Sequence, residues 1–226
     1  VPQTLLKLVP SHDVCVIELG TNHTGEIKFL SGIARPNRAV ITNIGPSHLE
    51  FLKDLNGVYE AKREIMAYMK KGDKVIVNGD DPFLARLRSE KYDIIRYGLK
   101  ESNDFKATSL SIAKGRIKFV VNGEHEYGLN AIGNHNVYNA LAAIALGSGF
   151  GISHSSMKKA LLNHTSAYMR MNIISLGGID VIDDCYNSNP LSMQCALEAL
   201  ASYPARSKWV VSADMLELGR TAAYYH

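Results

Sequence analysis

The chain has 226 residues, 46% of them hydrophobic, which is typical of a globular protein with one large domain or two smaller ones. Its 25 basic and 22 acidic residues are interspersed and leave a net charge of +3, so the composition does not favour a nucleic-acid partner. No apolar run approaches the roughly 18 to 20 residues of a membrane-spanning helix, and we expect no membrane insertion. Three scattered cysteines, Cys15, Cys185 and Cys195, fit reduced thiols in the cytoplasm better than a disulfide framework.

The first strand is expected at Val14–Leu19, a short β-branched run that reads as a buried strand. Glu18 lies at its end. The loop 20–25 and a short helix from Glu26 are expected to follow. This order predicts a parallel α/β architecture, in which the ligand site lies at the carboxyl ends of the strands.

A second strand, Ala39–Thr42, breaks at Asn43–Pro46 and leaves His48 just past its carboxyl end. If the two strands are neighbours, Glu18 and His48 emerge at the same edge of the sheet. A carboxylate and an imidazole there could hold a divalent cation, and Mg²⁺ would add water and substrate phosphates. The alternatives are a Glu18 carboxylate that caps a neighbouring helix and a His48 that is an ordinary loop histidine.

Lys62 falls on the apolar side of the next expected helix, residues 55–69. An unpaired ammonium is expensive to bury, so its position calls for an explanation. One is that the stem covers apolar surface while the amine reaches water. The other is a lysine directed at the strand ends, where it serves a metal or phosphate. The apolar stripe itself consists of Val58, Ala61, Ile65 and Met69.

The rest of the first unit continues the α/β alternation and then becomes β-rich. Strands are expected at 74–78 and 94–97, with a helix from Pro82 between them, then hairpins within 105–127 and helices from Ala140 and Ser153. The polar cluster Gly133–Asn139 lies where the alanine-rich helix begins. Its amides suit a phosphate or a purine edge, and the alternative is an elaborate helix cap.

A domain boundary is expected at Asn163–Ser166, which divides the chain into units 1–164 and 165–226. The second unit repeats the α/β pattern, with strands at 171–175, 180–184 and 208–212 and a helix from Pro190 to about Ala201. We expect the start of a Rossmann-like domain that the chain end truncates.

Taken in order, these segments resemble the Mur ligases of bacterial cell-wall synthesis, and most closely the MurF branch, which adds D-alanyl-D-alanine to UDP-N-acetylmuramoyl-tripeptide. No single segment is specific, but the ordered set is. The branch depends mainly on the last two segments. The matching residues are 18–20 with 25–27, 42–45 with 48–50, 61–64, 133–136 with 139–140, 170–171, 183–190 with 192–193, and 214–219.

The resemblance implies a metal site and a nucleotide site. It implies that Glu18 and His48 bind Mg²⁺ and that Lys62, carbamylated in several members of the family, helps to hold a second ion. His48 and Lys62 would thereby be the catalytic pair. The nucleotide and substrate residues implied are Asn136 and Asn139 near the adenine, Arg170 at the domain junction, Asp184 near the ribose, and Tyr186, Asn187 and Asn189 at the nucleotide and incoming dipeptide.

The chemistry implied by the resemblance begins when ATP phosphorylates the terminal carboxylate of the UDP-linked tripeptide. The amine of D-alanyl-D-alanine then attacks the acyl phosphate, and phosphate leaves as the amide forms. Mg²⁺ would neutralise the crowded phosphate and carboxylate oxygens. The partners expected are these small molecules, with the protein acting as a cytoplasmic monomer.

One family feature is missing, because no Gly-x-x-Gly-Lys-Thr phosphate loop occurs in the sequence. We therefore expect a fragment of a longer ligase, inactive on its own. The alternatives are a non-catalytic binding or scaffold module, or a ligase of another Mur or folylpolyglutamate type. The segment from Tyr186 to Pro190 argues against another ligase type.

Overall fold

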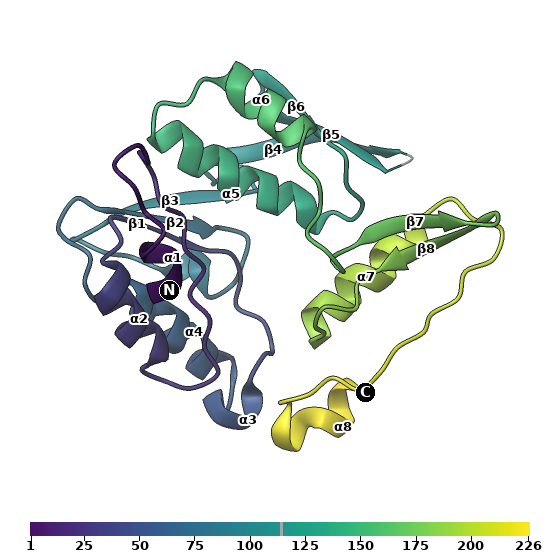
Figure 1. Ribbon diagram of the computed structural model, residues 1–226, viewed down its shortest axis with the longest axis horizontal. Coiled ribbons are helices and arrows are strands. Elements are labelled where there is room, and N and C mark those ends of the chain that lie inside the picture. Colours follow the sequence, from purple (N-terminus) through teal and green to yellow (C-terminus); the bar gives the residue numbers. More distant parts are fainter. Residues whose placement is uncertain (114) are drawn as a thin grey trace.

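The computed structural model describes residues 1–113 and 115–226. A six-stranded sheet with helices on both faces forms the body of the molecule, and a smaller unit of two strands and a 13-residue helix follows it (Figure 1). The predicted fold class is confirmed: a mostly parallel α/β sheet with a β-rich appendage, then a small α/β unit. Among the described residues, no helix combines the length and apolar character that crossing a membrane requires.

The strands lie in the sheet in chain order, from β1 at one edge to β6 at the other. β1 to β4 are parallel to their neighbours, whereas β4, β5 and β6 are antiparallel. Ile41 lies opposite Val77, and Val77 opposite Arg96, so the carboxyl ends of β1, β2 and β3 share one edge. The bounds are β1 Arg38–Ile41, β2 Lys74–Asn78, β3 Asp93–Gly98, β4 Phe105–Ala113, β5 Arg116–Val121 and β6 His125–Leu129.

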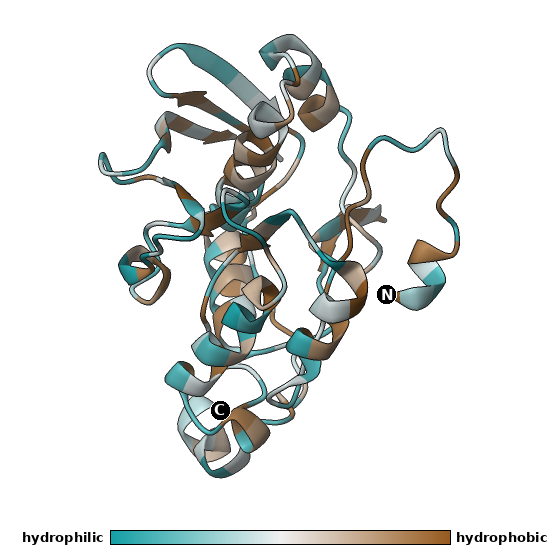
Figure 2. Cartoon of the chain, turned by 90° about the vertical axis from the view of Figure 1, so that its left-hand side faces the viewer, coloured by the Kyte–Doolittle hydropathy of each residue, from teal (hydrophilic) through white to brown (hydrophobic). Residues whose placement is uncertain are grey.

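The strand β2 supplies apolar side chains to both faces of the sheet. Val75 and Val77 belong to one core, which includes α4, and Ile76 belongs to the other, which includes α5. All three are at most 1% exposed, as expected of a strand buried on both sides. Figure 2 shows hydrophobic residues gathered on the strands and hydrophilic residues in most of the loops.

Helices of the first unit cover the two faces of the sheet, whereas α1 buries no residue. The helix predicted to run from residue 55 to 69 is shorter: α4 ends at Arg63 and continues as one 3₁₀ turn, η1. The bounds are α1 Pro2–Leu5, α2 Glu26–Ala34, α3 Leu49–Leu52, α4 Leu55–Arg63, η1 Glu64–Met66, η2 Leu84–Arg86, α5 His135–Gly149 and α6 His154–Leu162.

The second unit begins with the antiparallel hairpin of β7, Asn172–Leu176, and β8, Ile179–Asp183. Gly177 and Gly178 form its turn with φ values of 57° and 86°, a backbone that glycine adopts without strain. The helix α7, Pro190–Ser202, packs on the hairpin through Ala199 and Ala196. The chain then returns toward α3 through η3, Gly219–Thr221, and α8, Ala222–Tyr225 (Figure 1).

Two predicted strands are wrong. Val14–Leu19 and Lys208–Ser212 both lack strand structure, and Val16 and Val211 are 77% and 101% exposed. Figure 2 shows the N-terminal segment standing away from the sheet. A β-branched run becomes a strand only where a neighbouring strand pairs with its N–H and C=O groups. Among the described residues neither run has such a neighbour.

The helix predicted from Pro82 is also wrong in length. Only the 3₁₀ turn η2 forms, because Leu87 already has an extended backbone with ψ of 126°. The amides of Phe83 and Leu84 donate to the carboxylate of Asp81, which caps this turn.

Gly57 offers a test of how tightly α3 and α4 are joined. A Cβ at Gly57 would lie 1.9 Å from the carbonyl oxygen of Leu52. Alanine favours a helix over glycine by about 1 kcal/mol, but overpacking against backbone costs about 2 kcal/mol. We therefore expect Gly57→Ala to lower the free energy of unfolding, measured with urea.

Gly149→Ala is the matched control for this prediction. Its Cβ would meet no atom nearer than Arg38 Nε at 3.7 Å, an ordinary contact. We expect this variant to be as stable as the unsubstituted chain or more stable. Equal effects of the two substitutions would contradict the close approach of α4 to the Leu52 carbonyl.

Candidate nucleotide and metal site

The loop that follows β1 is held in place at its first peptide groups. The ammonium of Lys62 donates to the carbonyl oxygen of Asn43 at 2.8 Å. The amide of Ile44 donates to the carboxylate of Asp81 at 2.7 Å. Lys62 therefore reaches the end of β1, as one of the two explanations of its position required. Burial lowers the pKa of Lys62, and the nearby Asp81 carboxylate opposes that shift.

His48 lies four residues further along this loop, at the start of α3. Its backbone is left-handed, with φ of 55°. The ring nitrogen Nδ1 contacts the carboxylate of Glu217, which comes from the C-terminal segment. The carbonyl of Glu217 also accepts from the amide of Glu50 at 3.1 Å. The loop after β1 and the C-terminal segment are thus joined by two adjacent contacts, both of which involve Glu217.

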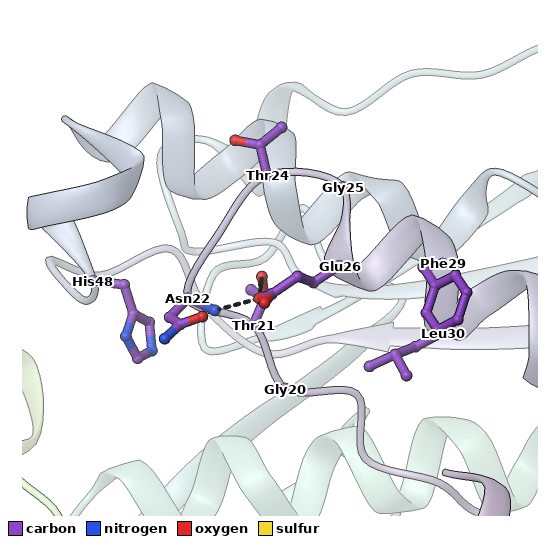
Figure 3. Close-up of a pocket in the computed structure, with 9 residues that line it drawn as sticks. All are labelled: Gly20, Thr21, Asn22, Thr24, Gly25, Glu26, Phe29, Leu30 and His48. Atoms are coloured by element: carbon purple, nitrogen blue, oxygen red, sulfur yellow. Dashed lines mark hydrogen bonds between the residues drawn. The ribbon is translucent and has the colours of Figure 1, made fainter.

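An open hollow of about 720 Å³ lies beside His48. Figure 3 shows the His48 ring next to Asn22 at one end of it, and Phe29 with Leu30 at the other. The remaining lining residues are Gly20, Thr21, Thr24, Gly25 and Glu26.

Glu26 organises one wall of this hollow. Its carboxylate accepts from the amides of His23 and Asn22 at 3.0 and 2.8 Å, and from the hydroxyl of Thr21. These bonds lower the pKa of Glu26, the bond from His23 most. The Glu64 carboxylate accepts from the amides of Gly25 and Lys28, so it caps the N-terminus of α2. Both the Glu26 and the Glu64 carboxylates thus accept hydrogen bonds from amides of the protein.

Glu18 does not meet His48 in the way the sequence predicts. It belongs to the exposed segment before α2, follows no strand, and is absent from the lining of the hollow. Within residues 1–113 and 115–226, no three His, Cys, Asp or Glu side chains converge as a metal site would require. The imidazole and carboxylates available fit Mg²⁺ only together with water and phosphate oxygens. The roles of Glu18, His48 and Lys62 as ligands stay predictions.

The polar cluster at the start of α5 is ordered by its own amides. Asn136 donates to the carbonyl oxygen of Ile132 at 2.8 Å, and Asn139 donates to Asn136 Oδ1 at 3.2 Å. Asn139 is exposed. Gly133 has φ of 85°, and a Cβ there would lie 2.6 Å from the His135 ring. The cluster therefore orders the N-terminus of α5 and leaves the Asn139 amide exposed. This arrangement is compatible with a nucleotide site and with a helix cap.

The structure brings Arg170, Asp184 and Tyr186 together. The Arg170 guanidinium lies 4.3 Å from the centre of the Tyr186 ring, and Asp184 accepts from the amide of Met171 at 3.1 Å. Burial raises the pKa of Asp184, and the charges of His135 and Arg170 oppose that shift. Asp184 is thus linked electrostatically to the start of α5.

Asn187 and Asn189 play local structural roles. The side chain of Asn189 accepts from the amide of Ser192 at 2.9 Å and forms a capping box at the start of α7. Asn187 Oδ1 accepts from the amide of Ser188 at 2.9 Å. Their predicted contacts with nucleotide or dipeptide stay predictions.

The sequence patterns indicate no individual role for Glu217, Asp80, Asp81, Glu64 or His135. Glu217 lies in the segment 214–219, which carried part of the family resemblance, and Asp80 and Asp81 follow a predicted strand. No local signal shows which distant atoms these side chains reach, because their partners lie up to 169 residues away.

Comparison with known proteins now adds the family. Residues 1–147 match the Mur ligase middle domain, and residues 169–226 match the Mur ligase glutamate ligase domain. The chain belongs to the Mur ligase family.

Similar proteins include ligases of the MurF branch. The UDP-N-acetylmuramoyl-tripeptide–D-alanyl-D-alanine ligase of Bacillus subtilis is 36% identical over 228 residues, which cover 100% of this chain and 50% of that protein. A crystal structure of MurF from Acinetobacter baumannii matches 99% of this chain and 50% of its own, with a TM-score of 0.93 and 33% identity.

A structure of MurF from Thermotoga maritima in complex with ADP shares the fold, with a TM-score of 0.89 at 24% identity over 99% of this chain and 52% of that one. The chain thus spans about half the length of the relatives it matches.

The helix cap of Asn189 generates a prediction for this Mur ligase chain. We expect Asn189→Ala to lower the free energy of unfolding by about 1 kcal/mol, because the amide of Ser192 loses its partner. Asn189→Asp keeps an acceptor and should retain most of the stability. The measurement is urea unfolding followed by circular dichroism.

Asn187→Ala is the control for this prediction, because among the described residues the Asn187 side chain accepts only from its neighbour Ser188. It should change the unfolding free energy by no more than a few tenths of a kcal/mol, the usual range for an exposed side chain. An Asn189→Ala variant as stable as Asn187→Ala would argue against the capping role.

Proposed function

We propose that this chain is the middle and C-terminal part of an ATP-dependent ligase that joins D-alanyl-D-alanine to UDP-N-acetylmuramoyl-tripeptide. The observation that carries the proposal is the full-length match of the chain, at 36% identity, to the Bacillus subtilis ligase of that name. The ligase would act as a cytoplasmic monomer on small molecules.

The nucleotide would lie between the start of α5 and the cluster around Asp184. The exposed amide of Asn139 offers a donor and an acceptor to a purine edge, while Asn136 holds Asn139 in place. Asp184 would accept from ribose hydroxyls, and Arg170 would bring positive charge to the phosphates. Tyr186 supports that guanidinium with its ring face. Tyr186, Asn187 and Asn189 are proposed to border the dipeptide.

The phosphates would extend from there toward the loop after β1. His48 and Glu18 are the proposed protein ligands of Mg²⁺, and a carbamate on Lys62 would add two oxygens while keeping an N–H for the Asn43 carbonyl. When bound, Mg²⁺ supplies charge neutralisation for phosphoryl transfer to the tripeptide carboxylate. The protein would orient that carboxylate and the incoming amine around the strand ends.

The experiment uses the longer polypeptide to which this chain corresponds, incubated with ATP, Mg²⁺, UDP-N-acetylmuramoyl-tripeptide and D-alanyl-D-alanine. We expect phosphate release that depends on both substrates, together with a product whose mass equals tripeptide plus dipeptide less water. Glutamate and diaminopimelate serve as control amines, and we expect neither to replace the dipeptide. Preferential use of one of them would move the protein to another branch of the family.

The 226-residue chain alone is the second control. We expect no phosphate release from it, because the sequence contains no Gly-x-x-Gly-Lys-Thr loop to hold the phosphates. Turnover by this chain alone would contradict the fragment interpretation. A longer polypeptide that binds ATP without turnover would instead support the non-catalytic alternative.

A further inference from the structure

Two adjacent carboxylates, Asp80 and Asp81, follow the carboxyl end of β2 and diverge to opposite sides. Asp81 reaches back to the exit of β1, and Asp80 reaches forward to the exit of β3 and to α5. Asp81 is 8% exposed and Asp80 is half-buried. Neither has a role in the proposed reaction. Asp81 nevertheless contacts the loop that carries His48, and Asp80 contacts the helix that carries Asn136 and Asn139.

Asp81 and Lys62 hold the same peptide group from its two ends. Asp81 Oδ2 accepts from the amide of Ile44 at 2.7 Å, and Lys62 donates to the carbonyl of Asn43 at 2.8 Å. The peptide plane between these residues is therefore fixed in position and orientation. His48 follows four residues later, so the direction in which its loop leaves β1 is set here. The other oxygen of Asp81 caps η2 through Phe83 and Leu84.

Asp80 makes the corresponding connection on the nucleotide side. Its carboxylate accepts from the amide of Leu99 at 2.6 Å, from the Asn103 amide group at 2.8 Å and from the Tyr138 hydroxyl at 3.0 Å. Burial raises the pKa of Asp80, but these bonds outweigh it and leave the pKa lowered. Tyr138 lies on α5 between Asn136 and Asn139, and burial with the Asp80 contact raises its pKa to about 12.

The backbone around Asp80 leaves room for this arrangement. A Cβ at Gly98 would lie 2.6 Å from Asp80 Cγ, and a Cβ at Gly79 would lie 1.9 Å from Asn103 Oδ1. Side chains at either position would displace the carboxylate or its partner. The cluster is therefore a packed feature of the fold rather than a chance surface contact.

We propose that Asp80 and Asp81 are positioning residues of the ligase: Asp81 sets the His48 loop and Asp80 sets the start of α5, both from the end of β2. This inference rests on the proposed function for its catalytic meaning. The competing account is that the two carboxylates only terminate β2 and cap η2, with no influence on the candidate site.

Two conservative variants of the 226-residue chain test the two connections separately. Asp81→Asn keeps an oxygen for the amides of Phe83 and Leu84 but turns an NH₂ group toward Ile44, because two donors outcompete one for the oxygen. Tyr138→Phe removes only the hydroxyl that joins Asp80 to α5. Each variant is the matched control for the other.

Amide hydrogen exchange, followed by NMR, measures the effect of each variant on its own segment without nucleotide. In Asp81→Asn we expect exchange at Ile44 to accelerate by about tenfold or more, the usual effect of losing a charge-assisted bond, with the first turn of α5 unchanged. In Tyr138→Phe we expect faster exchange at Asn139 and Ala140 and no change at Ile44. Unchanged exchange at these amides, or equal changes in both variants, would overturn the proposal.

Steady-state kinetics of the longer ligase test whether the two residues affect catalysis. Asp81→Asn should lower kcat with little change in KM for ATP, and Tyr138→Phe should raise KM for ATP with little change in kcat. Equal loss of both parameters in both variants would indicate a merely structural role and overturn the positioning assignment. An inactive unsubstituted ligase would count against the proposed function alone, because the exchange result does not depend on turnover.

Discussion

The double burial of β2 is the constraint on which the rest of the structure depends. Val75, Ile76 and Val77 alternate between two cores and are almost fully inaccessible, so the strand can neither shift its register nor leave the sheet. Its neighbours β1 and β3 take their positions from it. Just past its end, Asp81 accepts from the loop after β1, and Asp80 accepts from Leu99 after β3 and from Tyr138 on α5. The candidate site is thus attached to a strand that is buried on both faces.

The second unit approaches this edge of the sheet closely at two glycines, where an added side chain would be crowded. A Cβ at Gly45 would lie 3.0 Å from Leu191 at the start of α7. A Cβ at Gly219, whose φ is 54°, would lie 3.0 Å from Glu50 Cα. Both contacts flank the His48 loop, which is therefore contacted by residues from distant parts of the chain. Such close approach of backbone is one of the uses of glycine in proteins.

Much of the fold could be predicted from the sequence because its signals are local. The run Lys74–Asn78, the alanine-rich helix and the Gly177–Gly178 turn each carry their own pattern, and each forms. Val14–Leu19 and Lys208–Ser212 carry a similar pattern but lack a partner strand among the described residues, and pattern alone does not supply one.

The candidate site was less predictable, because its contacts are long-range. That Lys62 faces inward was predictable from helical spacing, but its acceptor, the Asn43 carbonyl, was not. The contact of His48 with Glu217 joins residues 169 positions apart. Family resemblance selected most candidate residues, yet it gave no role to the carboxylates that fix their loops. Those carboxylates accept from backbone amides. Because every residue type except proline has such an amide, the sequence does not reveal which residue is the partner.

Two features of the Lys62 environment act on its charge in opposite directions. As an ammonium it holds the Asn43 carbonyl, and the negative charge of Asp81 favours that form. Burial acts in the other direction and lowers the pKa, which increases the fraction of neutral amine at a given pH. The neutral amine is the nucleophilic form, and only that form can combine with carbon dioxide to give a carbamate. Burial therefore favours the neutral amine that a carbamate would require, whereas the negative charge of Asp81 favours the ammonium that donates to the Asn43 carbonyl.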